Sequence, residues 1–165
     1  VITLYPVRMV SRYTYEVNGI QNLERVADIR ASLSGMSGSL LMAEDKLPDG
    51  LSENLLFGGE TAENQIKSGF YTFGYCQSLE SPQVFKLYLK SRDGKVYVLE
   101  QDVSAQIHSV PVKGHIGDVH LIINLNFDVP ENKPDGGGGG NNSSGGAGFD
   151  VGVDDWADVN EDIIC

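Results

Sequence analysis

The stretch Val84-Phe85-Lys86-Leu87-Tyr88-Leu89-Lys90 decides the fold, because its apolar side chains recur at every second position. Residues 85, 87 and 89 share one face, while both lysines lie on the other, as in a half-buried β-strand. Arg92-Asp93-Gly94 then predicts a turn, and Val96 and Val98 begin a returning strand. This segment is therefore predicted to be a β-hairpin with one dry and one wet face.

Other segments repeat the pattern, with turn residues between them. The run Tyr13–Val17 is rich in aromatic and β-branched residues and is followed by Asn18-Gly19, which predicts a strand and a turn. Asn22 is placed to cap a short helical turn. Further strands are predicted at Val26–Ser34, Asn54–Phe57, Gly69–Cys76 and Val119–Val129, with a turn or bulge at Ser34–Gly38, a core segment at Leu40–Met42 and a loop at Leu47–Gly50.

About seven strands with almost no helix indicate an all-β protein. A sheet with one apolar face must cover that face, so two packed antiparallel sheets are expected. The strand spacing favours a β-sandwich of the Greek-key type. No segment shows the strand and long-helix alternation that is typical of a parallel sheet.

The glycine tract Gly136–Gly140 divides the chain. We expect a sandwich domain at 1–130, a Gly/Asn/Ser-rich linker or loop at 131–148, and an acidic segment at 149–165. The 13 residues from Gly136 to Gly148 span roughly 20 Å as a random coil, enough to cross one face of a sandwich or to reach an adjacent subunit. The tract is no phosphate-binding loop, because no Lys-Ser/Thr pair ends it.

Charge and composition limit the partners. The chain has 165 residues and a net charge of −11, most of which falls from Asp128 onward. Such a tail repels nucleic acid and anionic membranes, and it also keeps a flexible segment in solution. Val1 is not an initiator methionine and no leader follows it, so we expect a processed protein or a piece of a longer one.

The segment from Phe149 to Val153 alternates apolar with polar or small residues, and Trp156 follows it. Backbone hydrogen bonds to a sheet edge would position it, and alternate side chains would fill pockets. The candidate docking residues are Phe149, Val151, Val153 and Trp156. Three alternatives stay open: the last strand of its own sandwich, a strand added to another chain, and a disordered tail.

No motif indicates catalysis, a cofactor or a metal. His108, His115 and His120 do not have the spacing of a zinc site, and we interpret them as solvated or structural. The aspartates between Asp150 and Asp158 lack the order of a calcium-binding loop. Ser34–Gly38 departs from the nucleophile-elbow pattern at its first position. We therefore expect no enzyme, no cofactor and no metal.

Two cysteines are too few for a disulfide framework. Cys76 ends an aromatic, strand-like run, which predicts a buried and unreactive thiol. Cys165 is the last residue and is expected to be exposed. Their pairing would require the tail to fold back beside Cys76, so we do not expect it.

Short motifs along nearly the whole chain resemble an uncharacterised family of Bacteroidales surface lipoproteins, which is similar to fimbrillin-associated anchor and tip proteins. These motifs are Tyr13–Val17, Asn22-Leu23, Ala31–Met36, Gly69–Gly74, Asp93-Gly94-Lys95, Gln101-Asp102-Val103 and Val153–Trp156. The resemblance implies a transthyretin-like sandwich, an earlier domain and a lipid anchor that this chain lacks. It also implies a place on the outer membrane or cell surface, and no catalytic residues.

The function expected from these features is a structural or adhesive module in fimbria (pilus) assembly or adhesion. Its partners would be protein subunits of a surface assembly or a host or glycan ligand. The alternative is a glycan-binding module of a surface nutrient-capture system. It would use exposed aromatics on one flat face, with Tyr71, Tyr75, Tyr88 and Tyr97 as candidates.

Overall fold

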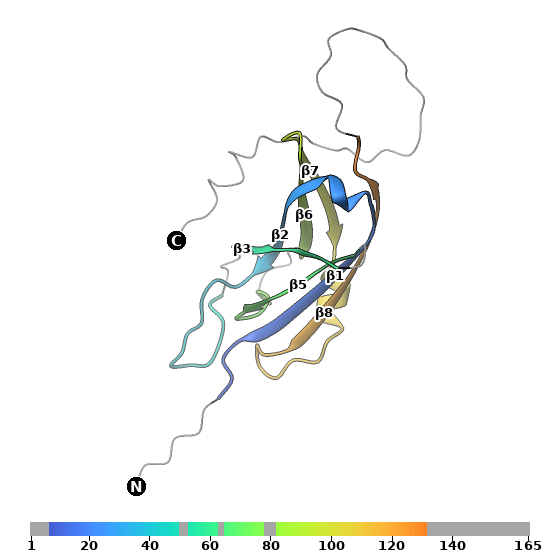
Figure 1. The fold of residues 1–165 in the computed structure, drawn as a ribbon. Helices are drawn as coiled ribbons and strands as arrows, with labels where there is room; N and C mark the ends of the chain where they lie inside the picture. Colours follow the sequence, from blue (N-terminus) through green and yellow to red (C-terminus); the bar gives the residue numbers. More distant parts are fainter. Residues whose placement is uncertain (1–6, 50–52, 63–64, 78–81, 132–165) are drawn as a thin grey trace.

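The structure is a computed structural model that describes residues 7–49, 53–62, 65–77 and 82–131. Figure 1 shows two layers of strands. In chain order the elements are β1 (Ser11–Gln21), the 3-10 helix η1 (Leu23–Arg25), β2 (Val26–Met36), β3 (Glu53–Gly58), β4 (Glu60–Ala62), β5 (Gln65–Thr72), β6 (Val84–Ser91), β7 (Val96–Asp102), the helix α1 (Ser104–His108) and β8 (Asp118–Asp128).

The eight strands of the described residues form two four-stranded sheets, in the orders β4-β5-β1-β8 and β3-β2-β6-β7. The predicted all-β sandwich is confirmed. All strand pairs are antiparallel except β1 and β8, which run parallel. A parallel pair needs a long crossover connection, and here the whole second sheet lies between the two strands in sequence.

The core lies between the two sheets and follows the period-two pattern. Phe85, Leu87 and Leu89 of β6 are fully buried, as the hairpin predicts. They face the buried side chains of β1 across the interlayer, where the rings of Tyr15 and Phe85 lie 5.1 Å apart. Burial of each such side chain contributes roughly 1.5–3 kcal/mol, so this interlayer supplies most of the driving force for folding.

The predicted turn at Asn18-Gly19 is wrong, because β1 continues through it to Gln21. Gly19 instead forms a bulge with φ +87°, where the pairing of β1 with β8 shifts register. A Cβ atom at this position would lie 1.8 Å from the carbonyl oxygen of Leu125. The glycine therefore serves the close approach of two strands and does not reverse the chain.

Three other local predictions need correction. The stretch Leu40–Met42 does not return to the core, since Met42 is 71% exposed in a turn closed by the Leu41–Lys46 bridge. Asn22 precedes η1 in a left-handed conformation and makes no side-chain cap. The strand predicted to reach Cys76 ends at Thr72, although Cys76 is buried as expected and its N–H bonds the carbonyl of Gly35.

We expect Gly19→Ala to lower the free energy of unfolding by about 3 kcal/mol. The alanine side chain would clash with the backbone of β8, and the left-handed conformation at this position is strained for any residue other than glycine. Gly58→Ala in β3 is the matched control. A Cβ there meets nothing within 4 Å, so its effect should stay below about 1 kcal/mol. Urea unfolding of both variants measures the difference, and equal stabilities would contradict the bulge.

Burial raises the pKa of Tyr13 and of Tyr15 well above the ordinary value of 10.0. The unfolded chain therefore loses these protons first as the pH rises, so stability should be complete below about pH 10 and fall above it. Tyr13→Phe should reduce the fall, and Tyr71→Phe, at a 69% exposed position, should not. Urea titrations between pH 8 and 11 test this, and identical slopes for both variants would refute it.

Candidate functional site

The predicted docking residues Phe149, Val151, Val153 and Trp156 lie outside the described residues, so the structure does not place them. What it does show is where an added strand could pair. Each sheet has two outer strands, β4 and β8 in one and β3 and β7 in the other. The two sides of the sandwich differ in how well these outer strands are covered.

One side is closed by the chain itself. Strand β3 ends at Gly58 and β4 begins at Glu60, so the chain steps directly from one sheet to the other. The hydroxyl of Tyr15 donates a hydrogen bond to the carbonyl of Gly58 at 2.8 Å, and the N–H of Gly59 bonds the carbonyl of Ile29. Since β4 has only three residues, this side leaves little edge for another strand.

The other side lies between β7 and β8 and is covered only in part. Helix α1 follows β7 there, and its Ile107 is fully buried between the sheets. The side-chain amide of Gln106 pairs with the outer edge of β8. Its Nε2 donates to the carbonyl of Ile122 at 2.9 Å, and its Oε1 accepts from the N–H of Ile122 at 2.8 Å. One glutamine thus imitates a single residue of a neighbouring strand.

Beyond Ile122 the edge of β8 continues without such a partner among the described residues. Backbone groups of alternate residues point to the same side, so those of Asn124 point outward with Ile122, up to the register shift that follows Asn124. Beside them, Leu125 and Phe127 are only half-buried and face the interlayer, where the ring of Phe127 lies 5.3 Å from that of Tyr97 in β7. We call the part of β8 that follows Ile122, with its half-buried residues Leu125 and Phe127, the open edge.

The open edge has only some of the usual protections of an outer strand, namely the register shift after Asn124 and the charged Asp128 at its end. With 11 residues β8 is long, and it contains no lysine, arginine or proline. Natural edge strands are commonly kept short, charged or interrupted by proline to prevent pairing with another chain. The open edge can therefore offer main-chain hydrogen bonds next to an apolar slot, which are the two features that strand addition uses. Figure 1 shows β8 at the margin of its sheet.

The three histidines are not brought together. The ring of His108 packs on Tyr75 with centroids 4.8 Å apart, His115 Nε2 lies 3.2 Å from the carbonyl oxygen of Met9, and His120 Nδ1 lies 2.9 Å from Thr14 Oγ1. In the part of the chain that the structure describes, no group of three metal-ligating side chains forms. The aspartates from Asp150 to Asp158 and Cys165 fall outside that part.

The four candidate tyrosines do not form one platform. Tyr71 is exposed on β5 in one sheet, while Tyr88 is half-buried on the outer face of the other and lies near the hydroxyl of Ser32. Tyr97 faces the interlayer against Phe127, and Tyr75 packs on His108. Residues of helix α1 were missed from the sequence, because five residues are too short for a periodic signal.

Comparison with known proteins adds to this geometry. A family model described as "Domain of unknown function (DUF5119)" matches residues 1–58. A solved structure from Bacteroides ovatus, described as a "putative adhesin", is similar with a TM-score of 0.57 and 17% sequence identity, covering 76% of this chain and 50% of that one. The chain thus spans about half the length of that protein. No curated protein matches. At this identity the similarity shows a shared fold.

None of the helices in the described ranges is long and apolar enough to cross a membrane.

We expect Gln106→Ala to expose the backbone of Ile122 and to speed hydrogen exchange at its amide. The lost pair of hydrogen bonds should cost about 1 kcal/mol of stability, since water replaces them at an exposed edge. Gln21→Ala, at the exposed end of β1, is the control and should change neither quantity. Exchange measured by NMR decides, and an unchanged amide of Ile122 in the Gln106→Ala variant would show that the side chain does not guard the edge.

Proposed function

We propose that this chain is a non-catalytic structural or adhesive module of a cell-surface assembly of the fimbrial type, and that it joins a neighbouring subunit by strand addition at the open edge. The observation that carries the proposal is the combination found there. The outward-pointing backbone groups of Asn124, on an outer strand, lie next to the half-buried side chains of Phe127 and Tyr97.

The segment from Phe149 to Val153 of a neighbouring copy is the strand that we assign to this edge. Its alternation would direct Phe149, Val151 and Val153 into the slot beside Phe127. Asp150 would then lie on the solvent side, next to the uncharged Asn124 and Asn126. The glycine-rich stretch before Phe149 is long enough to carry this segment to an adjacent subunit.

The surface location is part of the same proposal. Its support is the shared fold with the Bacteroides ovatus protein described as a "putative adhesin", together with the family resemblance carried by the motifs of this sequence. A lipid anchor and an earlier domain would place the module outside the outer membrane. Protein subunits of the assembly would be its partners, and no bond chemistry would be involved.

A disulfide experiment on the full chain tests the docking. Asn124→Cys and Asp150→Cys are combined, because both new thiols would lie on the solvent side of adjacent strands. Cys165→Ser is added so that the native terminal thiol cannot form the cross-link. After mild oxidation we expect a ladder of covalent multimers on non-reducing gels. The matched control pairs Asp150→Cys with Glu100→Cys, an exposed position on β7 in the other sheet, and should give no ladder.

Each result has a definite meaning. A cross-link confined to the monomer would show that the tail closes its own sandwich, and the assembly role would fail. Equal ladders from the test pair and the control would show random collision, and no cross-link at all would show that the segment does not reach β8. The last two outcomes would also remove the proposal.

A further inference from the structure

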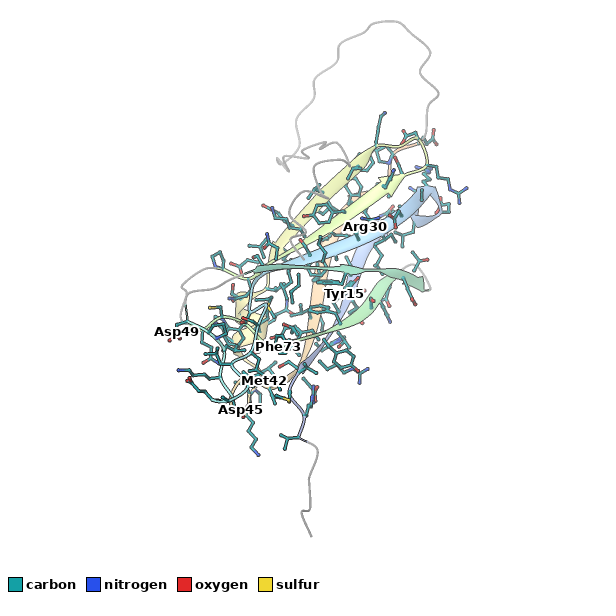
Figure 2. All side chains as sticks on the ribbon, turned by 90° about the vertical axis from the view of Figure 1, so that its left-hand side faces the viewer. Tyr15, Arg30, Met42, Asp45, Asp49 and Phe73 are labelled. Atoms are coloured by element: carbon teal, nitrogen blue, oxygen red, sulfur yellow. The ribbon has the colours of Figure 1, made fainter. Side chains whose placement is uncertain are left out.

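A pocket of about 300 Å³ lies at the end of the sandwich where the described chain begins. It is built by three loops, and the side chains that matter for its chemistry are Asp45, Leu47, Pro48, Asp49, Gln77 and His115. Figure 2 shows Met42, Asp45 and Asp49 at this end of the molecule, away from Arg30. His115 lies beside Ser11 near the start of β8, whereas the open edge lies toward the end of that strand, so the pocket is separate from the open edge. Its volume is at the lower end of the range for ligand sites.

Backbone contacts hold the three loops in place. The N–H of Leu41 bonds the carbonyl of Lys46 at 2.9 Å, which closes the turn that carries Asp45. The N–H of Lys113 bonds the carbonyl of Ile116 at 2.9 Å and closes the turn that carries His115. Gly74, with φ +124°, lets the loop before Gln77 approach, since a Cβ there would lie 2.7 Å from the carbonyl oxygen of His115. The lining is therefore preorganised.

His115 supplies a buried acceptor. Its side chain is only 5% exposed, and its Nε2 lies 3.2 Å from the carbonyl oxygen of Met9, so that nitrogen must carry the proton. In the neutral ring Nδ1 then holds a lone pair. This atom lies 4.0 Å from Oδ1 of Asp45, too far for a direct hydrogen bond. Two acceptors therefore face the same gap, and a ligand hydroxyl between them could donate to either.

The remaining lining favours a ring with many hydroxyls. Asp45 and Asp49 are acceptors, and the Gln77 amide both donates and accepts. Lys46 also lines the pocket, and its ammonium group lies 2.7 Å from Glu44; the hydrogen bond to Glu44, with a smaller contribution from the charge of Asp49, raises the pKa of Lys46. Leu47 and Pro48 add an apolar wall. A pyranose sugar presents hydroxyl groups at its rim and C–H groups on its face, so it matches both parts of the lining.

We propose that this pocket binds a single pyranose unit, such as the terminal sugar of a glycan. A metal ion fits less well, because no three metal-ligating side chains gather in the described ranges. The inference goes beyond strand addition and does not depend on it. A module that joins an assembly at the open edge would hold a sugar at a different place on its surface.

The test is an NMR titration of the full chain with free galactose, mannose, fucose and N-acetylglucosamine, each up to about 100 mM, so that dissociation constants in the millimolar range are detected. At least one sugar should shift the amide signals of Gln77, Gly114 and His115 in a saturable way. Asp45→Asn and Asp49→Asn should each weaken this binding about tenfold, since a charge-assisted hydrogen bond becomes a neutral one.

Asn tolerates the left-handed conformation of Asp45, where φ is +50°, so the first variant should keep the fold. Glu100→Gln removes the same charge on β7 and should bind as the parent does. A further arm adds calcium chloride and then EDTA without sugar. The proposal is overturned if no sugar shifts these signals, if the pocket variants bind as tightly as Glu100→Gln, or if calcium alone shifts them and sugar does not.

Discussion

The separation of side chains onto two faces of each strand is the constraint on which this structure depends. Tyr13, Tyr15 and Val17 of β1 are buried together with Phe85, Leu87 and Leu89 of β6 because each set recurs at every second residue. A shift of one residue in either strand would turn its apolar set toward water. Every other feature, including the loops at one end and the open edge at one side, is held in position by this interlayer.

Period-two patterns predicted the fold well, because burial enforces them. Strand β6 and the last strand β8 are predicted nearly to their ends, whereas of β7 only the start at Val96 and Val98 is predicted and the strand continues to Asp102. The errors arose where tertiary contacts override local signals. Asn18-Gly19 is typical of a hairpin turn, yet its glycine is needed for the approach of β8, a strand about a hundred residues away. Leu40–Met42 is apolar but belongs to a turn, because its backbone pairs with Lys46.

The sites were harder to predict, for a physical reason. The parallel pairing of β1 with β8 cannot be inferred from a hairpin, since no local turn connects them. The glutamine that covers Ile122 and the histidine that lines the pocket act through contacts between distant segments, and neither has a motif around it. The docking residues Phe149, Val151, Val153 and Trp156 stay a prediction, because they lie outside the described residues.

The parallel pairing of the first and last strands has a mechanical consequence. Ser11 lies beside the start of β8 and Gln21 beside its end, so the described chain enters at one end of the molecule and leaves at the other (Figure 1). Tension applied between the start of β1 and the end of β8 would slide β1 along β8. The hydrogen bonds between them run across the strands. These hydrogen bonds would therefore be loaded simultaneously, in shear, and would not break one after another.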